Sequence, residues 1–344
     1  MARSRRPAAR LATLLVLAAT ALLAGCETLA YYLQAVGGQV SLMTRARPVS
    51  DLIDDPATPE ALRARLALAR EIRAFSVERL GLPDNASYRA YAELDRPYAV
   101  WNVVGAPEFA LDPVQSCFPI AGCVAYRGFF GKEDADAYAA RLRAEGNDVY
   151  VYGVPAYSTL GRLDDPLLST FIRYPDADLA RLLFHELAHQ VAYVKDDSTF
   201  NESFAVVVER EGVRRWLGAT GRSAQMQGFL DGQKRAAATV ALIDQSRARL
   251  QALYRSRLAP EAMREKKRAE LESLGAALAA LRGSGDPAPN NAFLASFATY
   301  TELVPTFEHL LAEEGGDLAK FYAVVRKYAA SAPSSRGPLS KRTP

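Results

Sequence analysis

The sequence lacks the features of a nucleic-acid-binding, repeat or membrane-spanning protein. Its formal net charge is only +3 at pH 7, no internal repeat is evident, and charged residues make up an ordinary 24%. The apolar run Leu11–Leu23 is shorter than the roughly 20 residues that a membrane-spanning helix needs. A hydrophobic content of 49% is nevertheless enough for a sizeable core. Only three histidines and three cysteines are present, so any site built on them has few candidates.

The N-terminus has the composition of a secretory signal peptide. A basic segment precedes the apolar run, which ends in Leu22-Leu23-Ala24-Gly25-Cys26. These small residues before Cys26 are similar to the bacterial lipobox, in which the cysteine is lipidated and becomes the new N-terminus. We therefore predict a lipoprotein signal peptide over residues 1–25 and a lipid on Cys26. The alternative is an ordinary signal peptide with an incidental cysteine.

Cleavage changes the charge and suggests a location. The signal peptide holds four arginines and no acidic residue, so the net charge falls from +3 to −1, and no nucleic-acid partner is expected. Glu27 follows Cys26 and is not the aspartate that resemblance to lipoproteins associates with inner-membrane retention. We expect a protein anchored to the outer membrane by its lipid and facing the periplasm.

Cys117 and Cys123 are the cysteines that remain, separated by a loop that contains Pro119 and Gly122. An exported protein reaches an oxidising compartment, where two such cysteines can be bridged. We predict a disulfide between them. The alternative is a pair of free buried thiols, because spacing alone does not determine their Cα separation.

The first half of the mature chain is predicted to mix helices and strands. Helical spacing of apolar residues predicts a helix that begins at Thr58–Glu60 and another over Lys132–Glu145. Tyr98–Val104 and Val149–Val154 are rich in β-branched and aromatic residues, which favours strands.

Beyond Asn201 only helices are predicted. The expected ranges are about Phe200–Leu217, Ala224–Leu258 and Pro260–Leu281, followed by stretches from Ala292 and Asp317. The second and third of these are rich in charged residues and alanine, with sparse apolar positions. They are therefore expected to form a long helical hairpin at the surface.

The segment FHELAHQVAYVKDDSTFNESFA, Phe184–Ala205, contains two of the three histidines. His185 and His189 are about one helical turn apart, so both imidazoles can point at a single ion. Glu186 lies next to them, near enough to orient a water molecule without being a ligand. In that geometry zinc activates the water and polarises a carbonyl, while the carboxylate transfers the proton to the leaving amine. The pattern predicts one Zn²⁺ ion with Glu186 as the general base; the alternative is a chance match in a buried helix.

A catalytic zinc site needs a third protein ligand. Glu202 is the candidate, because a turn after Val194 and a helix restarting near Phe200 would bring it back against the first helix. The competing interpretation is a capping box over Thr199–Glu202, in which the glutamate bonds to the N-cap amide. We favour ligation.

Other residues remain as alternatives for the third ligand. Glu209 lies on the same face as Glu202 and is the reserve candidate, and Asp196 or Asp197 would make an aspartate-type site. His309 is expected to be an ordinary, partly exposed histidine.

The motif His185–His189 followed by Asn201–Ala205 resembles the gluzincin class of metallopeptidases. More closely, the chain resembles the bacterial putative-aminopeptidase lipoprotein family over nearly all of its mature length. The segments that carry this resemblance are Tyr31–Ala35, Leu82–Asn85, Trp101–Val103, Cys117–Pro119 with Gly122–Cys123, Tyr126–Gly128, Ala156–Gly161 and Asn290–Ala292. The resemblance implies a zinc peptidase with His185, His189 and Glu202 as ligands. The chain has no match to the Gly-x-Met-Glu-Asn segment with which well-known gluzincin aminopeptidases hold the substrate amine, and its spacing to Glu202 is shorter, so peptidase is the firmer prediction.

Four further residues are candidate substrate contacts. Tyr157 and Ser158 lie just before the metal helix, where zinc peptidases commonly have an edge strand that pairs with the substrate backbone. The alternative there is a tight turn that closes the sheet. Asn291 and Tyr300 are candidate donors to the oxyanion of the transition state, with packing as the alternative for each.

The predicted fold class is α+β, with a mixed first half containing a short sheet, a zinc-binding helix and a mostly helical second half with a long helical hairpin. Beyond the signal peptide, we expect a metallopeptidase core over 26–220, a helical region completing the fold over 221–330 and a disordered tail over 331–344. The predicted function is zinc-dependent hydrolysis of peptide bonds, with aminopeptidase as the predicted activity, and the bilayer is the expected partner of the lipid. The alternatives are an endopeptidase or amidase on cell-wall peptides and a non-catalytic envelope lipoprotein with a vestigial metal site. The sequence does not determine the oligomeric state.

The lipid anchor predicts a change in membrane fractionation. Replacing Cys26 with Ser removes the thiol that would carry the lipid, so Cys26→Ser should release soluble protein or block processing of the precursor. Fractionation of membranes in low-detergent extracts measures this. Unchanged membrane association of the variant would contradict the anchor.

Overall fold

The computed structural model describes residues 31–118, 122–156, 158–195, 197–283, 288–297 and 303–331. The predicted signal peptide, Cys26, Tyr157, Asp196, Tyr300 and nearly all of the predicted tail lie outside these residues. Within the described part of the chain, no helix is both long and apolar enough to cross a membrane.

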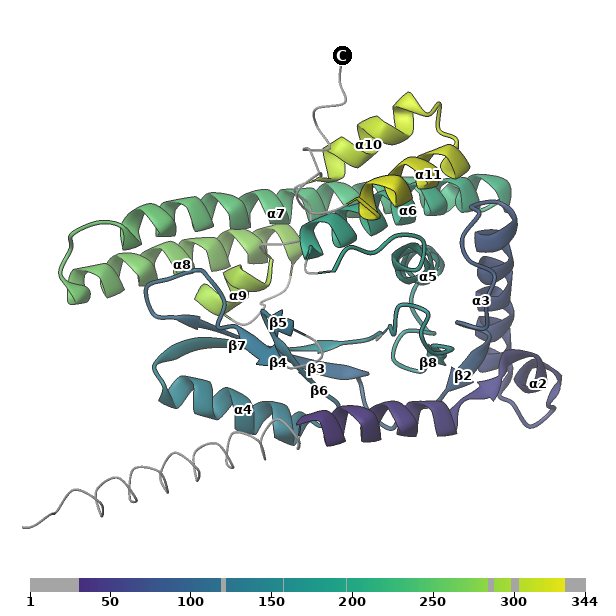
Figure 1. Ribbon diagram of the computed structural model, residues 1–344, viewed down its shortest axis with the longest axis horizontal. Coiled ribbons are helices and arrows are strands. Elements are labelled where there is room, and N and C mark those ends of the chain that lie inside the picture. Colours follow the sequence, from purple (N-terminus) through teal and green to yellow (C-terminus); the bar gives the residue numbers. More distant parts are fainter. Residues whose placement is uncertain are drawn as a thin grey trace, which may run out of the picture.

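A three-stranded antiparallel sheet lies at the centre of the first half. Its strands follow the order β6 (Arg127–Phe129), β3 (Val100–Pro107) and β7 (Asn147–Val154). Successive residues of β3 face opposite sides, so Val103 packs with α4 (Lys132–Ala144) and Val104 packs with α9 (Asn291–Ser296). Helices therefore cover both faces of the sheet, as Figure 1 shows.

Two smaller β units flank this sheet. The first has the strand order β1 (Arg47–Pro48), β2 (Ala90–Ala92) and β8 (Leu167–Leu168), in which β8 is parallel to β2. The second is a hairpin of β4 (Ser116–Phe118) and β5 (Gly122–Val124). Cys117 and Cys123 lie opposite each other in this hairpin, and a disulfide links them, which is the pairing expected from the sequence.

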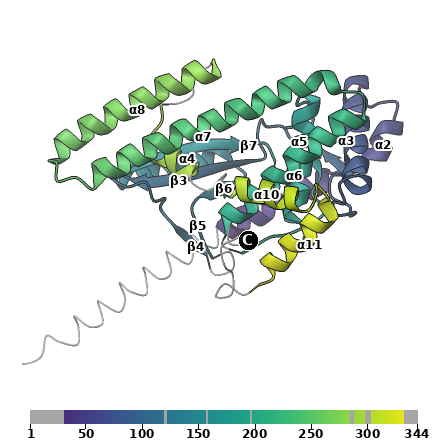
Figure 2. The same cartoon turned by 90° about the horizontal axis from the view of Figure 1, so that it is seen from above.

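The main hydrophobic core surrounds two neighbouring helices, α5 (Asp176–His189) and α6 (Ser198–Ala219). The helices that pack around them are α2 (Val49–Asp54), α3 (Glu60–Glu78), α10 (Val304–Glu313) and α11 (Leu318–Ala329). The buried ring of Phe204 on α6 lies 5.8 Å from Phe307 and 5.7 Å from Phe321. Helices from both ends of the chain thus complete one core, and Figure 2 shows α10 and α11 lying against α6.

The long helical pair is α7 (Met226–Tyr254) and α8 (Pro260–Arg282), which extend side by side away from α5 and α6 (Figure 1). Its outer surface is exposed, as expected, but a buried seam joins the two helices to α9. That seam contains Ile243, Leu250, Leu271, Leu274, Leu278, Phe293 and Leu294. Lys267 of α8 also donates to Asp148 at 2.7 Å and thereby attaches the hairpin to β7. The hairpin therefore contributes buried residues to the core in addition to its exposed outer surface.

The predicted α+β fold class is confirmed, and the two predicted strands are β3 and β7. Only helices follow Asn201 among the described residues, as predicted, although α10 is additional to the predicted set. The helix predicted to begin at Thr58–Glu60 is α3, which begins at Glu60 after Pro59 and has no side-chain cap. The division into domains stays a prediction.

Gly212 allows the close approach of α6 to α5. A Cβ atom at this position would lie 2.7 Å from the ring of Phe184 and 2.9 Å from the side chain of Leu80. Both neighbours are fully buried, so neither can move aside easily. The absence of a side chain at position 212 therefore sets the distance between the two helices.

Gly212→Ala should lower the free energy of unfolding by about 1–3 kcal/mol, because the added methyl group overpacks the core. Gly218→Ala is the matched control on the same helix, since a Cβ there meets nothing within 4 Å. The control should instead stabilise the protein by about 0.5–1 kcal/mol through higher helix propensity. Denaturant unfolding measures both, and equal effects of the two substitutions would contradict the packing role.

Candidate metal centre

The last turns of α5 present His185, Glu186 and His189. The helix buries Leu183 and Leu187 in the core, and its two histidines face α6. The side chain of His185 is 18% exposed and that of His189 is 7% exposed. Both imidazoles are therefore largely shielded from water, which strengthens their interactions with neighbouring charges.

The start of α6 differs from the capping box that was the competing interpretation. Asp197 is the N-cap residue, and its side chain accepts a hydrogen bond from the Phe200 amide at 2.9 Å. Thr199 lies inside the first turn. The capping interpretation of Glu202 is therefore wrong, and Asp197, one of the alternative ligands, is engaged as the cap.

Asn201 holds the connection between the two helices. Its side-chain oxygen accepts a hydrogen bond from the Val194 amide, and its side-chain nitrogen donates to the Val194 carbonyl, both at 2.8 Å. Asn201 is only 2% exposed, so water does not compete for these bonds. This double hydrogen bond places Glu202, the next residue, beside the histidines.

The donor groups of three side chains converge between α5 and α6. His185 Nε2 lies 3.2 Å from His189 Nε2 and 3.3 Å from Glu202 Oε2, and His189 Nε2 lies 3.7 Å from Glu202 Oε1. Tetrahedral zinc with bonds of about 2.0–2.1 Å separates its ligand atoms by about 3.3 Å. The spacing and the chemistry of the donor set both fit a zinc ion. The predicted ligand residues are thus brought together.

Glu209, the reserve ligand, lies on the other side of His185. Its Oε2 atom is 2.9 Å from His185 Nδ1 and 3.5 Å from Arg181 Nη1, and its side chain is only 8% exposed. A carboxylate that accepts the Nδ1 proton leaves Nε2 with its lone pair directed at the donor cluster. Glu209 is therefore placed to orient His185 and lies outside the group of His185, His189 and Glu202 that could hold a metal ion.

The electrostatics of the cluster favour a cation. Burial opposes a charge on His185, yet hydrogen bonds with Glu202 and Glu209 raise its pKa well above the ordinary value. Burial, with a contribution from His185, lowers the pKa of His189 to about 4, so that ring is neutral at neutral pH. A neutral imidazole next to carboxylates is a suitable environment for a divalent metal ion.

Glu186 lies beside the donor cluster without belonging to it. Burial, followed by the charges of Glu202, Asp165 and Glu209, raises its pKa to about 7, while His185 opposes the shift. Tyr88 is a neighbour that sequence reasoning missed. Burial and then the charges of Glu186 and Asp165 raise its pKa, while an interaction with the Ser158 hydroxyl opposes the shift. No spacing in the sequence indicates that Tyr88 would lie near Glu186.

Two of the loops that carried the family resemblance meet at the end of α5. Gln190 accepts a hydrogen bond from Asn85 Nδ2 at 2.6 Å and donates to Ser87 Oγ at 3.4 Å. A Cβ atom on Gly161, which has a φ of +75°, would lie 3.1 Å from the side chain of Gln190. These loops therefore support the metal helix.

The segment before the metal helix is a turn at its described residues. Buried Asp165 accepts hydrogen bonds from the Ser158 hydroxyl at 3.3 Å and from the Thr159 amide at 2.8 Å. Ser158 therefore stabilises a turn, and the edge-strand expectation does not hold at this residue. Tyr157 lies outside the described residues.

Asn291 is a packing residue and not an oxyanion donor. Its side-chain oxygen accepts a hydrogen bond from the Tyr254 hydroxyl at 2.8 Å, and its side-chain nitrogen donates to the carbonyls of Pro107 and Glu108, both at 3.0 Å. It is fully buried, so the alternative of core packing holds. His309 is 59% exposed at its side chain and pairs with Glu313, in line with an ordinary surface role.

Tyr152 of β7 is a second neighbour that sequence reasoning missed. Burial, and more weakly the charge of Glu202, raise its pKa, while a hydrogen bond donated by Asn102 at 3.3 Å opposes the shift. Its hydroxyl therefore stays protonated near the metal centre. The aromatic pattern of Val149–Val154 indicates a strand but does not indicate which ring approaches the site.

Comparison with known protein families gives a match over most of the chain. The family described as Putative aminopeptidase matches residues 30–338, which confirms the resemblance to a putative-aminopeptidase family over most of the chain. No curated protein and no solved structure matches the chain.

Metal content should distinguish the roles of Glu202 and Glu209 on α6. Glu202→Ala removes one of three protein donors and should abolish stable zinc binding, whereas Glu209→Ala should weaken zinc binding by roughly 10–100-fold through loss of ring orientation. Glu308→Ala, in an exposed pair with Arg210, is the control and should bind zinc normally. Zinc titration with elemental analysis measures all three. Full zinc occupancy in Glu202→Ala would exclude this residue as the ligand.

Proposed function

Because the chain belongs to the putative aminopeptidase family, we propose that it is a zinc-dependent peptidase of the gluzincin type. The observation that carries this proposal is the convergence of His185, His189 and Glu202 within 4.8 Å of one another. Two imidazoles and one carboxylate are a donor set known from catalytic zinc sites, which keep one position open for chemistry. Glu186 adds a base that is adjacent to the donors and is not one of them.

The residues of the site have different roles in the proposed reaction. His185, His189 and Glu202 would hold the ion. When bound, zinc supplies a Lewis acid that polarises the scissile carbonyl and makes water more acidic. Glu186 takes a proton from the attacking water and returns it to the leaving amine. Glu209 accepts the Nδ1 proton of His185 and so fixes the ring orientation.

The substrate class is peptides. The family description favours removal of N-terminal residues, whereas the absence of the Gly-x-Met-Glu-Asn segment leaves no known group to hold the substrate amine. An endopeptidase or an amidase on cell-wall peptides is therefore the second candidate. A peptide library with free and acetylated N-termini distinguishes them, because only an enzyme that does not need the free amine cleaves both.

The location is proposed to be the periplasmic face of the outer membrane. The lipobox-like stretch before Cys26 supports lipidation, and Glu27 supports transfer to the outer membrane. The disulfide between Cys117 and Cys123 supports an oxidising compartment. The partners would then be peptide substrates and, through the anchor, the bilayer.

Glu186→Gln tests the proposed mechanism. The amide keeps the shape of the side chain but cannot accept a proton, so zinc content should be unchanged while kcat falls by roughly 10²–10⁴-fold. Peptide hydrolysis and elemental analysis on the same preparations give both values, with Glu308→Gln as a surface control. Undiminished hydrolysis by Glu186→Gln would exclude Glu186 as the base, and an inactive wild-type zinc protein would favour the non-catalytic lipoprotein.

A further inference from the structure

The helix over residues 31–45 is attached firmly to the protein by one face. Gln34 donates to the Gly128 carbonyl at 3.3 Å and accepts from the Phe130 amide at 3.1 Å. One turn later, Gly38 packs so closely on the ring of Phe130 that a Cβ atom would lie 2.1 Å from it. Leu42, another turn on, is only 2% exposed. Three successive turns therefore fix the rotation of the helix about its axis.

The opposite face of this helix is apolar and exposed. Leu33 is 63% exposed, Val36 60% and Val40 53%, and their spacing places them in one stripe on the side away from Gln34 and Leu42. Among the described residues, eight large hydrophobic side chains are exposed, and three of them are in this stripe. Single exposed apolar residues are normal, but a row of three on one helix face needs an explanation.

Charge is absent from almost the whole helix. Residues 31–44 include no Asp, Glu, Lys, Arg or His, and Arg45 is the first charged residue. Tyr31 and Tyr32 begin the helix, and tyrosine rings are enriched at the boundary between water and lipid. A helix exposed only to water usually carries charged residues on its outer face. The composition suits the surface of a bilayer better than it suits bulk water.

The position of the helix in the chain brings it close to the proposed anchor. Tyr31 is five residues after Cys26. A fully extended chain of five residues spans at most about 18 Å. A lipid on Cys26 would therefore hold the start of this helix near the bilayer surface. The rigid attachment described above would then present the stripe in a constant orientation.

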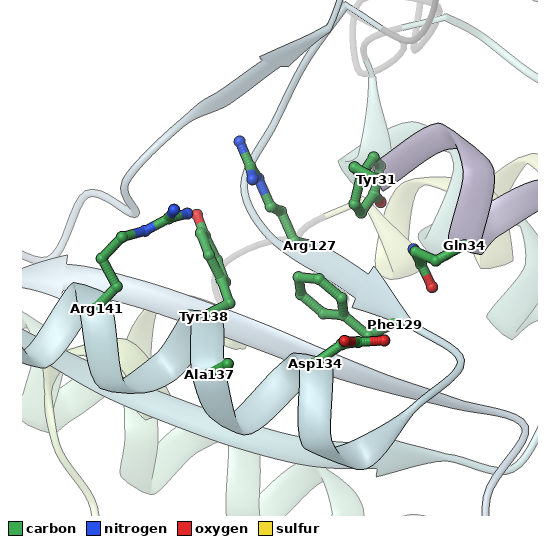
Figure 3. A pocket seen from close by; sticks show the side chains of 8 residues that line it. All are labelled: Tyr31, Gln34, Arg127, Phe129, Asp134, Ala137, Tyr138 and Arg141. Carbon is green, nitrogen blue, oxygen red and sulfur yellow. The ribbon is translucent and has the colours of Figure 1, made fainter. Parts of the chain in front are cut away.

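Positive groups lie beside the same end of the helix. Tyr31 lines a pocket of about 260 Å³ together with Arg127, Asp134, Tyr138 and Arg141, among others (Figure 3). The guanidinium carbons of Arg127 and Arg141 lie 4.7 Å and 5.0 Å from the ring centroid of Tyr138. Two guanidinium groups with one carboxylate make this pocket compatible with anionic lipid headgroups.

We propose that Leu33, Val36 and Val40 contact the lipid bilayer, so that the helix lies in the interface and sets the orientation of the protein on the membrane. This inference rests on the lipid anchor of the proposed function. Apolar side chains on an uncharged helix supply a second membrane contact in addition to the lipid. The stripe thus contacts the boundary between the acyl chains and the headgroups of the bilayer to which the chain is anchored.

Site-specific fluorescence on the full lipidated chain tests the contact. Val36→Cys is labelled with an environment-sensitive dye and reconstituted into vesicles of phosphatidylethanolamine and phosphatidylglycerol. Ser273→Cys, at an exposed position of α8, is the matched control. The native cysteines do not compete for the dye, because Cys117 and Cys123 are bridged and Cys26 would carry the lipid.

The label at position 36 should show blue-shifted emission and quenching by doxyl-labelled lipid, while the label at position 273 should show neither. Flotation of the vesicles reports the anchor independently of the stripe. Flotation without quenching at position 36 overturns the contact and leaves the anchor intact. Failure to float contradicts the anchor and this inference with it. A label at position 36 that is shielded by a second copy of the chain, detected by energy transfer between labels, also overturns the bilayer contact.

Discussion

The candidate metal centre depends on the close packing of α5 against α6. His185 and His189 come from one helix and Glu202 from the other, so the donors meet only if the two axes are at the right distance and the two helices are in register. Gly212 permits the distance, because its missing side chain leaves room for Phe184 and Leu80. Asp197 and Asn201 establish the register at the connection. The geometry of the site is therefore a property of the helix pair, and the core around it, closed by α3, α10 and α11, holds that pair in place.

The charge arrangement around the donors is as specific as their positions. Two carboxylates contact the two nitrogens of His185 from opposite sides, with Glu202 at Nε2 and Glu209 at Nδ1. In a largely buried site such charges are weakly screened, so the cluster is unfavourable unless positive charge is supplied. A divalent ion would supply it, and Arg181 beside Glu209 supplies part of it from the protein. The same carboxylates that favour an ion thus also orient one of its ligands.

Local patterns in the sequence were sufficient for the parts of the molecule that depend on neighbouring residues. The spacing of His185 and His189 on one helix, the strands β3 and β7, and the helical second half all follow from periodicity within single segments. The roles that were missed depend on contacts between distant segments. The role of Asn291 could not be predicted from its neighbours in the sequence, because the carbonyls of Pro107 and Glu108 that accept its hydrogen bonds lie in another part of the chain. The capping box over Thr199–Glu202 likewise satisfied the local rules. The structure shows instead that Asp197 caps α6 and that Glu202 contacts the histidines across the helix interface.

The double hydrogen bond of Asn201 affects how variation among relatives should be interpreted. Its amide must offer one donor and one acceptor to the same backbone residue, Val194, inside the protein. Aspartate has nearly the same shape but would present a second acceptor to the Val194 carbonyl, and serine would be too short to reach both groups. Selection should therefore keep asparagine at position 201 as strictly as it keeps the ligands, although this residue is not one of the converging donors. If asparagine is invariant at this position among relatives, the reason would be the structure of the turn. An alignment alone would therefore overstate the number of residues that take part in the chemistry.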